Sequence, residues 1–110
     1  MTKEISEIAF LLEGMMAEQR QIIGDILWLY GFSKIHQRYS IHLLLKLILP
    51  ALQHRQYLLH YQNQRPVAYC NWAFLNKEIL NLMLRGNYIL LPEQWQIGKF
   101  LYFPELIAPF

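Results

Sequence analysis

The apolar positions in the first third of the chain recur at helical spacing. Between residues 4 and 20, apolar side chains return every three or four positions, beginning with Ile5 and Ile8, while the glutamates lie largely on other faces. A second helical pattern covers residues 21–30, and Gly31 follows it in the position of a C-terminal cap. Two helices are therefore predicted before residue 31.

A third helix is predicted from Ile41 to about His54, after a connecting segment at residues 32–39. Ser40 stands where an N-cap side chain accepts a hydrogen bond from the first turn. The helix is apolar on nearly all sides, which indicates burial. Pro50 lies inside the pattern and is expected to kink or restart the helix, because proline removes a backbone donor.

The pattern changes after residue 56, where β-branched and aromatic residues dominate two segments. Residues 57–61 and 67–74 flank a polar stretch at residues 62–66, which predicts a β-hairpin. A short helix is predicted after it, with Asn76 as N-cap and Gly86 as its stop.

The last third of the chain contains a loop through Pro92 and Gly98 and then a strand at residues 99–103, which Pro104 ends or confines to a sheet edge. Helices followed by strands, with one helix between them, favour an α+β fold whose sheet is mostly antiparallel.

Length and composition favour one domain that spans residues 1–110 with one hydrophobic core. The chain is 55% hydrophobic and 16% charged, which excludes intrinsic disorder and indicates more apolar surface than a small monomer buries. A homo-oligomer is therefore expected. The formal charge of +2 comes from scattered lysines and arginines with no basic run, so nucleic-acid binding is not expected.

Cysteine use and the chain start indicate a cytoplasmic protein. Cys70 is the single cysteine, and no Cys/His cluster points to zinc. The first residues carry glutamates, unlike a secretion signal. The most apolar run, residues 41–52, is shorter than the roughly 20 residues that span a bilayer. Neither a bound cofactor, a metal site nor a membrane span is expected.

Several spaced motifs resemble those of the lysine acyltransferases that activate RTX toxins, the hemolysin-activating protein C-like family. The early motifs are Trp28-Leu29-Tyr30, Ser33-Lys34-Ile35-His36, Leu49-Pro50-Ala51-Leu52 and Gln56-Tyr57-Leu58-Leu59. The most specific is Pro66-Val67-Ala68-Tyr69-Cys70-Asn71-Trp72-Ala73-Phe74-Leu75. Glu93-Gln94-Trp95, Gly98 and Ile107-Ala108-Pro109-Phe110 complete a resemblance that covers about residues 22–110.

The resemblance implies a fold similar to the GCN5-related acetyltransferases. It also implies an enzyme that moves a fatty acyl group from acyl-carrier protein to internal lysines of an RTX protoxin and so activates the toxin. The family's essential histidine falls on His36, its serine on Ser33 and its catalytic aspartate on Glu105, which is one methylene longer. Relatives continue beyond the Ile-Ala-Pro-Phe motif, so the sheet is expected to be incomplete at its C-terminal end.

The chemistry of acyl transfer to lysine suits His36. The lysine ammonium must lose a proton before it attacks a thioester, and an imidazole with an unperturbed pKa of about 6.5 accepts one at neutral pH. Taken alone, His36 is better explained as a polar residue on a solvated turn. Ser33 either caps that turn or hydrogen-bonds His36, and Glu105 either orients a histidine or, as the sequence slightly favours, points to water. Lys34 and Arg38 flank His36 and are the candidate contacts for acidic acyl-carrier protein.

The remaining candidates have structural explanations. His42 follows a helix start, His54 ends a helix and His60 lies on a strand, while Cys70 is placed mid-strand without a basic neighbour. The three tryptophans are interpreted as core residues more than as the walls of an acyl tunnel. A second hypothesis stays open, in which the chain is a non-catalytic, truncated relative that serves as an oligomerisation or partner-binding module.

Overall fold

Helix α2 covers Ala17–Tyr30 in the computed structural model, which describes residues 16–110. The predicted break after residue 20 is wrong, because neither glycine nor proline interrupts the backbone there and the helix continues. The greater part of the helix predicted at residues 4–20 lies outside the described residues. Gly31 caps α2 as predicted, with its N–H on the carbonyls of Leu27 and Trp28, but with a right-handed φ of −61°.

Helix α3 covers Ile41–His54, the predicted range. The hydroxyl of Ser40 accepts the N–H of Leu43 at 3.1 Å and so satisfies one donor of the first turn. The helix passes through Pro50 without restarting. It ends at His54, and the next residue, Arg55, has a left-handed φ of 57°.

The predicted hairpin is confirmed in strands β1, Tyr57–Gln62, and β2, Arg65–Asn71. Its turn is only two residues long, because Asn63 and Gln64 both adopt positive φ, 52° and 66°. Two positive φ angles match the twist of neighbouring strands, so such turns connect strands tightly. A third strand, β5 at Leu106–Ile107, was not predicted; it pairs antiparallel with β2 and gives the order β1-β2-β5.

The predicted strand 67–74 is divided at Trp72. Its second part, β3 at Ala73–Leu75, pairs antiparallel with β4 at Phe100–Tyr102 in a separate sheet. Between these strands lie α4, Lys77–Arg85, and the short 3-10 helix η1, Pro92–Gln94. Gly98 permits this packing, because a Cβ at that position would lie 2.1 Å from the carbonyl oxygen of Leu75.

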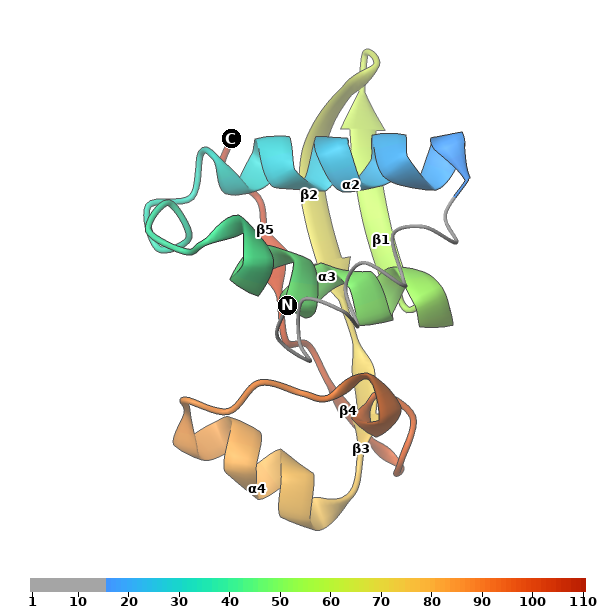
Figure 1. Ribbon diagram of the computed structural model, residues 1–110, viewed down its shortest axis with the longest axis vertical. Coiled ribbons are helices and arrows are strands. Elements are labelled where there is room, and N and C mark those ends of the chain that lie inside the picture. The colour runs from blue at the N-terminus through green and yellow to red at the C-terminus, as the bar shows by residue number, and fades with distance from the viewer. Residues whose placement is uncertain (1–15) are drawn as a thin grey trace, which may run out of the picture.

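The elements form two adjoining parts (Figure 1). Helices α2 and α3 cover one face of the β1-β2-β5 sheet, and α4 and η1 pack beside β3 and β4. The buried apolar side chains accordingly form two clusters, one under α2 and α3 and one around Trp95, and Tyr57 packs against both. The α+β class and the antiparallel pairing of the strands are confirmed.

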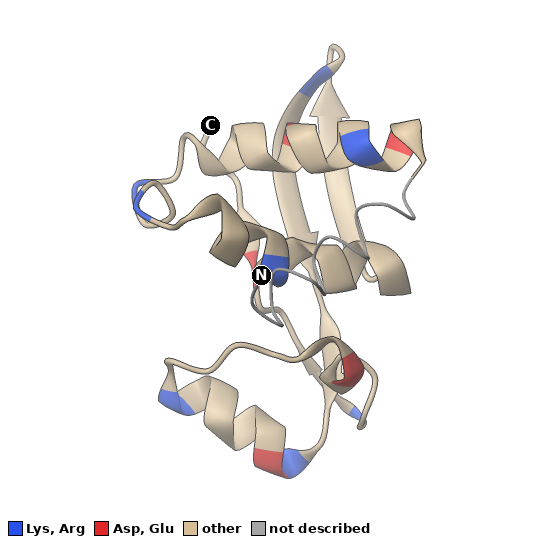
Figure 2. Cartoon of the chain, in the orientation of Figure 1, with Lys and Arg blue, Asp and Glu red and all other residues tan. Residues whose placement is uncertain are grey.

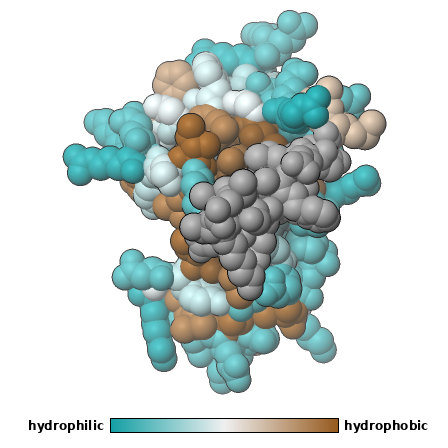
Figure 3. Space-filling model, in the orientation of Figure 1, coloured by the Kyte–Doolittle hydropathy of each residue, from teal (hydrophilic) through white to brown (hydrophobic). Residues whose placement is uncertain are grey.

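Apolar side chains also reach the surface. On the face seen in Figure 3, hydrophobic side chains lie over the α2–α3 layer and around α4. Leu58 and Leu106 are 61% and 72% exposed on the sheet. Within residues 16–110, no helix has the length and apolar character needed to cross a membrane.

Candidate functional site

The loop between α2 and α3 positions His36. Turns stabilise this loop, since the His36 N–H donates to the carbonyl of Ser33 and the Tyr39 N–H donates to the carbonyl of His36. The imidazole packs edge-on against the rings of Tyr30 and Tyr39, with centroid distances of 4.7 and 5.1 Å. His36 is only 9% exposed, so the interpretation of a polar residue on a solvated turn is wrong.

Each nitrogen of the His36 ring has a partner. Ser33 Oγ lies 2.6 Å from Nδ1. Glu105 Oε2 lies 3.4 Å from Nε2. The three candidate residues Ser33, His36 and Glu105 thus form one chain of polar contacts, although Glu105 comes from a distant part of the sequence. The contact to Glu105 is longer than a typical hydrogen bond, so it is the looser of the two.

Glu105 is held at the crossing between the two sheets. It lies between β4 and β5, opposite Asn71 at the end of β2. Its backbone N–H donates to Asn71 Oδ1 at 3.0 Å, and its carbonyl accepts the N–H of Asn71 at 3.1 Å. Asn71 is fully buried, and its amide also donates to the Tyr69 hydroxyl. These contacts fix the backbone from which the carboxylate reaches His36.

The electrostatics of the Glu105 carboxyl are dominated by burial. Glu105 is 9% exposed, which corrects the interpretation that its carboxylate points to water. Burial raises its pKa above the ordinary value of 4.5, while nearby His36 and the hydrogen bond from Tyr30 lower it by less. The Tyr30 hydroxyl donates to Oε1 at 3.1 Å. Burial and the charge of Glu105 raise the pKa of Tyr30, so the phenol stays protonated and remains a donor.

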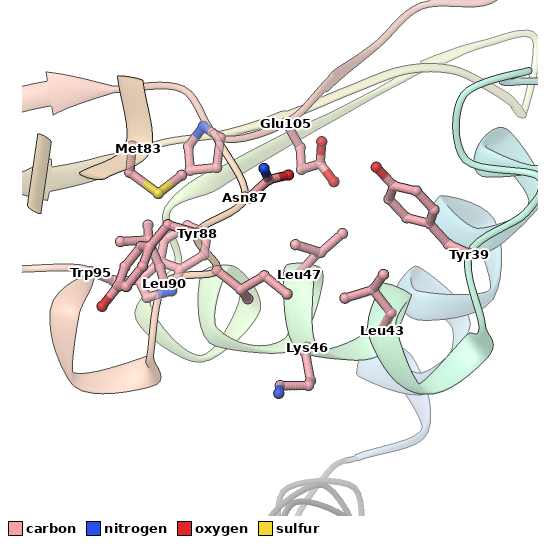
Figure 4. A pocket seen from close by; sticks show the side chains of 12 residues that line it. Tyr39, Leu43, Lys46, Leu47, Met83, Asn87, Tyr88, Leu90, Trp95 and Glu105 are labelled. Atoms are coloured by element: carbon pink, nitrogen blue, oxygen red, sulfur yellow. The ribbon is translucent and has the colours of Figure 1, made fainter. Parts of the chain in front are cut away.

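A cavity of about 460 Å³ opens beside this group of residues. Glu105 and Tyr39 line one part of it, and Tyr39 also packs on the His36 ring. Figure 4 shows the carboxylate of Glu105 and the hydroxyl of Tyr39 on the same side of the cavity, facing each other. A buried titratable side chain that lines a cavity marks a candidate position for chemistry on a bound substrate.

The two basic candidates lie on the exposed surface of the His36 loop. Lys34 and Arg38 are both exposed, and the segment from residue 31 to residue 40 contains no acidic residue. In Figure 2 the tip of this loop is coloured for positive charge. The surface near His36 therefore has a local positive potential, which favours an acidic partner.

The other candidates remain structural. His54 Nε2 lies 3.1 Å from the carbonyl oxygen of Pro92, and His60 is exposed on β1. Cys70 is a free, half-buried thiol. Trp95 is buried as predicted, but Trp28 is 42% exposed, which corrects its assignment to the core. No cluster of metal-ligand side chains occurs in the described part of the chain.

Two residues of the site were not predicted from the sequence. Tyr30 was named only as part of the Trp28-Leu29-Tyr30 motif, and its hydroxyl is the second partner of the Glu105 carboxyl group. Asn71 lay within a matched motif without a role. An asparagine among the apolar residues of a strand is unusual, because its amide must be hydrogen-bonded when it is buried. That position was the one indication in the sequence that Asn71 has a structural role.

Known proteins match the part of the chain that contains these motifs. The model of the HlyC family, RTX toxin acyltransferases, matches residues 15–110. The chain is 38% identical over 97 residues to the lysine-acyltransferase RtxC of Vibrio cholerae. It is 37% identical over 89 residues to the leukotoxin-activating lysine-acyltransferase LktC serotype A1 of Mannheimia haemolytica. It is 36% identical over 88 residues to the protein-lysine myristoyltransferase RtxC of Kingella kingae.

These alignments include most of this chain and about half to two thirds of each relative. They cover 86%, 81% and 80% of this chain, in the same order. They cover 63%, 53% and 53% of the three relatives. The matched portion includes the loop of His36 and the segment of Glu105.

Proposed function

Because the chain belongs to the RTX toxin acyltransferase family, we propose that it moves a fatty acyl group from acyl-carrier protein to internal lysines of an RTX protoxin. The observation that carries the proposal is the contact between His36 and Glu105 at the edge of a cavity. Lysine acylation is also the activity named for the relatives in Vibrio cholerae and Kingella kingae.

In the proposed reaction the His36–Glu105 pair accepts one proton as a unit. The lysine ammonium first loses one proton to solvent, and its neutral amine attacks the carbonyl carbon of the acyl thioester. As the new C–N bond forms, the nitrogen gives its second proton to the His36–Glu105 pair. The C–S bond then breaks, and the thiolate of the carrier leaves with the proton that the pair returns. Ser33 orients the imidazole through Nδ1, so that Nε2 faces Glu105, whose side chain lines the cavity.

The raised pKa of Glu105 suits this role. A carboxylate that burial has made more basic attracts the proton on Nε2 more strongly than a solvated one would. Since Tyr30 holds the carboxyl group of Glu105 and Asn71 holds its backbone, little reorganisation is needed when the proton moves.

Acyl-carrier protein, the proposed donor, would dock on the positive loop surface. Lys34 and Arg38 support this proposal, since they lie within the same loop as His36 and face solvent. Exposed charges of this kind act mainly on the rate of association, so their contribution should weaken as ionic strength rises.

Three broader proposals accompany the activity. The chain is one domain of the GCN5-related acetyltransferase type, supported by two helices on one face of an antiparallel sheet. It works in the cytoplasm, as its proposed co-substrate requires. It forms a homo-oligomer, supported by the exposed Leu58 and Leu106; a light-scattering dilution series that finds a monomer throughout contradicts this last proposal.

The experiment that tests the function incubates the protein with acyl-carrier thioester and protoxin and maps acylated lysines by mass spectrometry. His36→Ala should reduce the rate by at least about 10²-fold, the usual contribution of a general base. His60→Ala, exposed on β1, is the matched control and should not change it. An unchanged rate in His36→Ala removes His36 from the mechanism. Inactive wild type, under conditions where the Vibrio cholerae relative acts, favours the non-catalytic module.

A further inference from the structure

The cavity beside Glu105 has a polar end and an apolar end. In Figure 4, Glu105 and Tyr39 lie at one end, whereas Met83 and Trp95 lie at the other. Leu43 and Leu47 of α3 form the wall between these ends. Lys46 contributes to the lining, but its ammonium group points away from the other labelled side chains. Asn87 adds an amide group near Glu105, so the space is a mainly apolar cavity that meets a carboxylate at one end only.

We propose that this cavity is the binding site for the hydrocarbon chain of the acyl donor. The thioester carbonyl lies at the end formed by Glu105 and Tyr39, and the tail extends between α3 and α4 toward Met83 and Trp95. The assignment rests on the proposed function for the identity of the ligand. The cavity volume of about 460 Å³ is within the range of small-molecule sites, roughly 300–1,000 Å³.

The lysine acceptor does not fit the same space. An ammonium group placed among Leu47, Met83 and Trp95 would lose its hydration without gaining a charged partner, which is strongly unfavourable. At the other end the Glu105 carboxylate provides that partner. The two substrates therefore approach Glu105 from opposite sides, with the acyl chain inside the cavity and the amine at its edge.

Chain length should control affinity through this cavity. Each methylene that enters should tighten binding about fourfold, the equilibrium equivalent of removing one methylene from water. The gain should stop when the tail reaches Met83 and Trp95. The position of Met83 on α4 therefore sets the preferred chain length.

The test measures binding of acyl-pantetheine thioesters of increasing chain length to the full chain by calorimetry, with no lysine acceptor present. In wild type the dissociation constant should fall with each methylene and then level off. Met83→Trp should bring this levelling to shorter chains and weaken the longest ligands at least about tenfold. In Met83→Ala the affinity should continue to rise up to longer acyl chains, a result that a misfolded variant cannot give. Leu84→Trp, on the neighbouring but 67% exposed position of α4, is the matched control and should match wild type.

Two outcomes overturn the assignment. If the affinity of wild type does not depend on acyl-chain length, the acyl chain does not enter an apolar site. If affinity depends on acyl-chain length in the same way in wild type, Met83→Trp and Met83→Ala, the acyl chain binds elsewhere. Failure of the proposed function has a different signature, in which the Met83 variants change binding as expected but no lysine becomes acylated in the transfer assay.

Discussion

Burial of the Glu105 carboxyl should cost the protein stability as the pH rises. Burial raises its pKa above 4.5 in the folded state, so above pH 4.5 the folded chain holds a proton that the unfolded chain has lost. The free energy of unfolding then falls with increasing pH, since the folded state binds more protons. This contribution is complete below pH 4.5 and is lost as the pH passes through the folded-state pKa.

Glu105→Gln removes this dependence while keeping the size of the side chain. For a single proton the slope is at most about 1.4 kcal/mol per pH unit. The amide oxygen of the variant remains an acceptor for the Tyr30 hydroxyl, so the 3.1 Å hydrogen bond can persist. We therefore expect the stability of the variant relative to wild type to increase from pH 4.5 upward and to level off once Glu105 is ionised.

Urea unfolding of both proteins at intervals from acid to neutral pH measures this difference. Glu93→Gln, at an exposed position on η1, controls for the loss of one negative charge and should show no such trend. If wild type instead gains stability over Glu105→Gln as the pH rises through the same window, His36 and Tyr30 stabilise the carboxylate by more than burial costs, and the reasoning is refuted. In the transfer assay the same variant should lose about 10²-fold or more, because the amide cannot accept the proton.

Three further changes probe the site and its support. Tyr30→Phe removes the hydrogen bond that lowers the pKa of Glu105, so the acidic limb of the pH–rate profile should move to higher pH; an unmoved limb contradicts this. Gly98→Ala should destabilise the fold by about 1–3 kcal/mol in urea unfolding, because its Cβ would overlap the carbonyl of Leu75; a neutral effect would show that this approach relaxes easily. Asn76→Ala should cost about 1 kcal/mol in the same measurement through the lost cap of α4, whereas Asn76→Ser should retain most of it.

Local patterns were sufficient wherever a short stretch of chain decides its own conformation. The limits of α3 followed from Ser40 and the apolar run behind it, because a capping side chain acts within one turn. Asn76 and Gly86 marked α4 in the same way. The hairpin followed from two strand-forming segments around a polar turn, although the turn proved shorter than its polar stretch. Motif spacing also identified the family before any three-dimensional information.

Only the tertiary structure decided what surrounds the candidate site residues. Sequence alone left Glu105 facing water, since nothing within a few residues indicated a partner. The division of one predicted strand at Trp72 leads the chain from one sheet to the other, and the return from β4 to β5 brings Glu105 against Asn71. That crossing places the carboxyl beside His36 and Tyr30, from the opposite end of the chain. The raised pKa and the cavity follow from this long-range packing, which no local periodicity encodes.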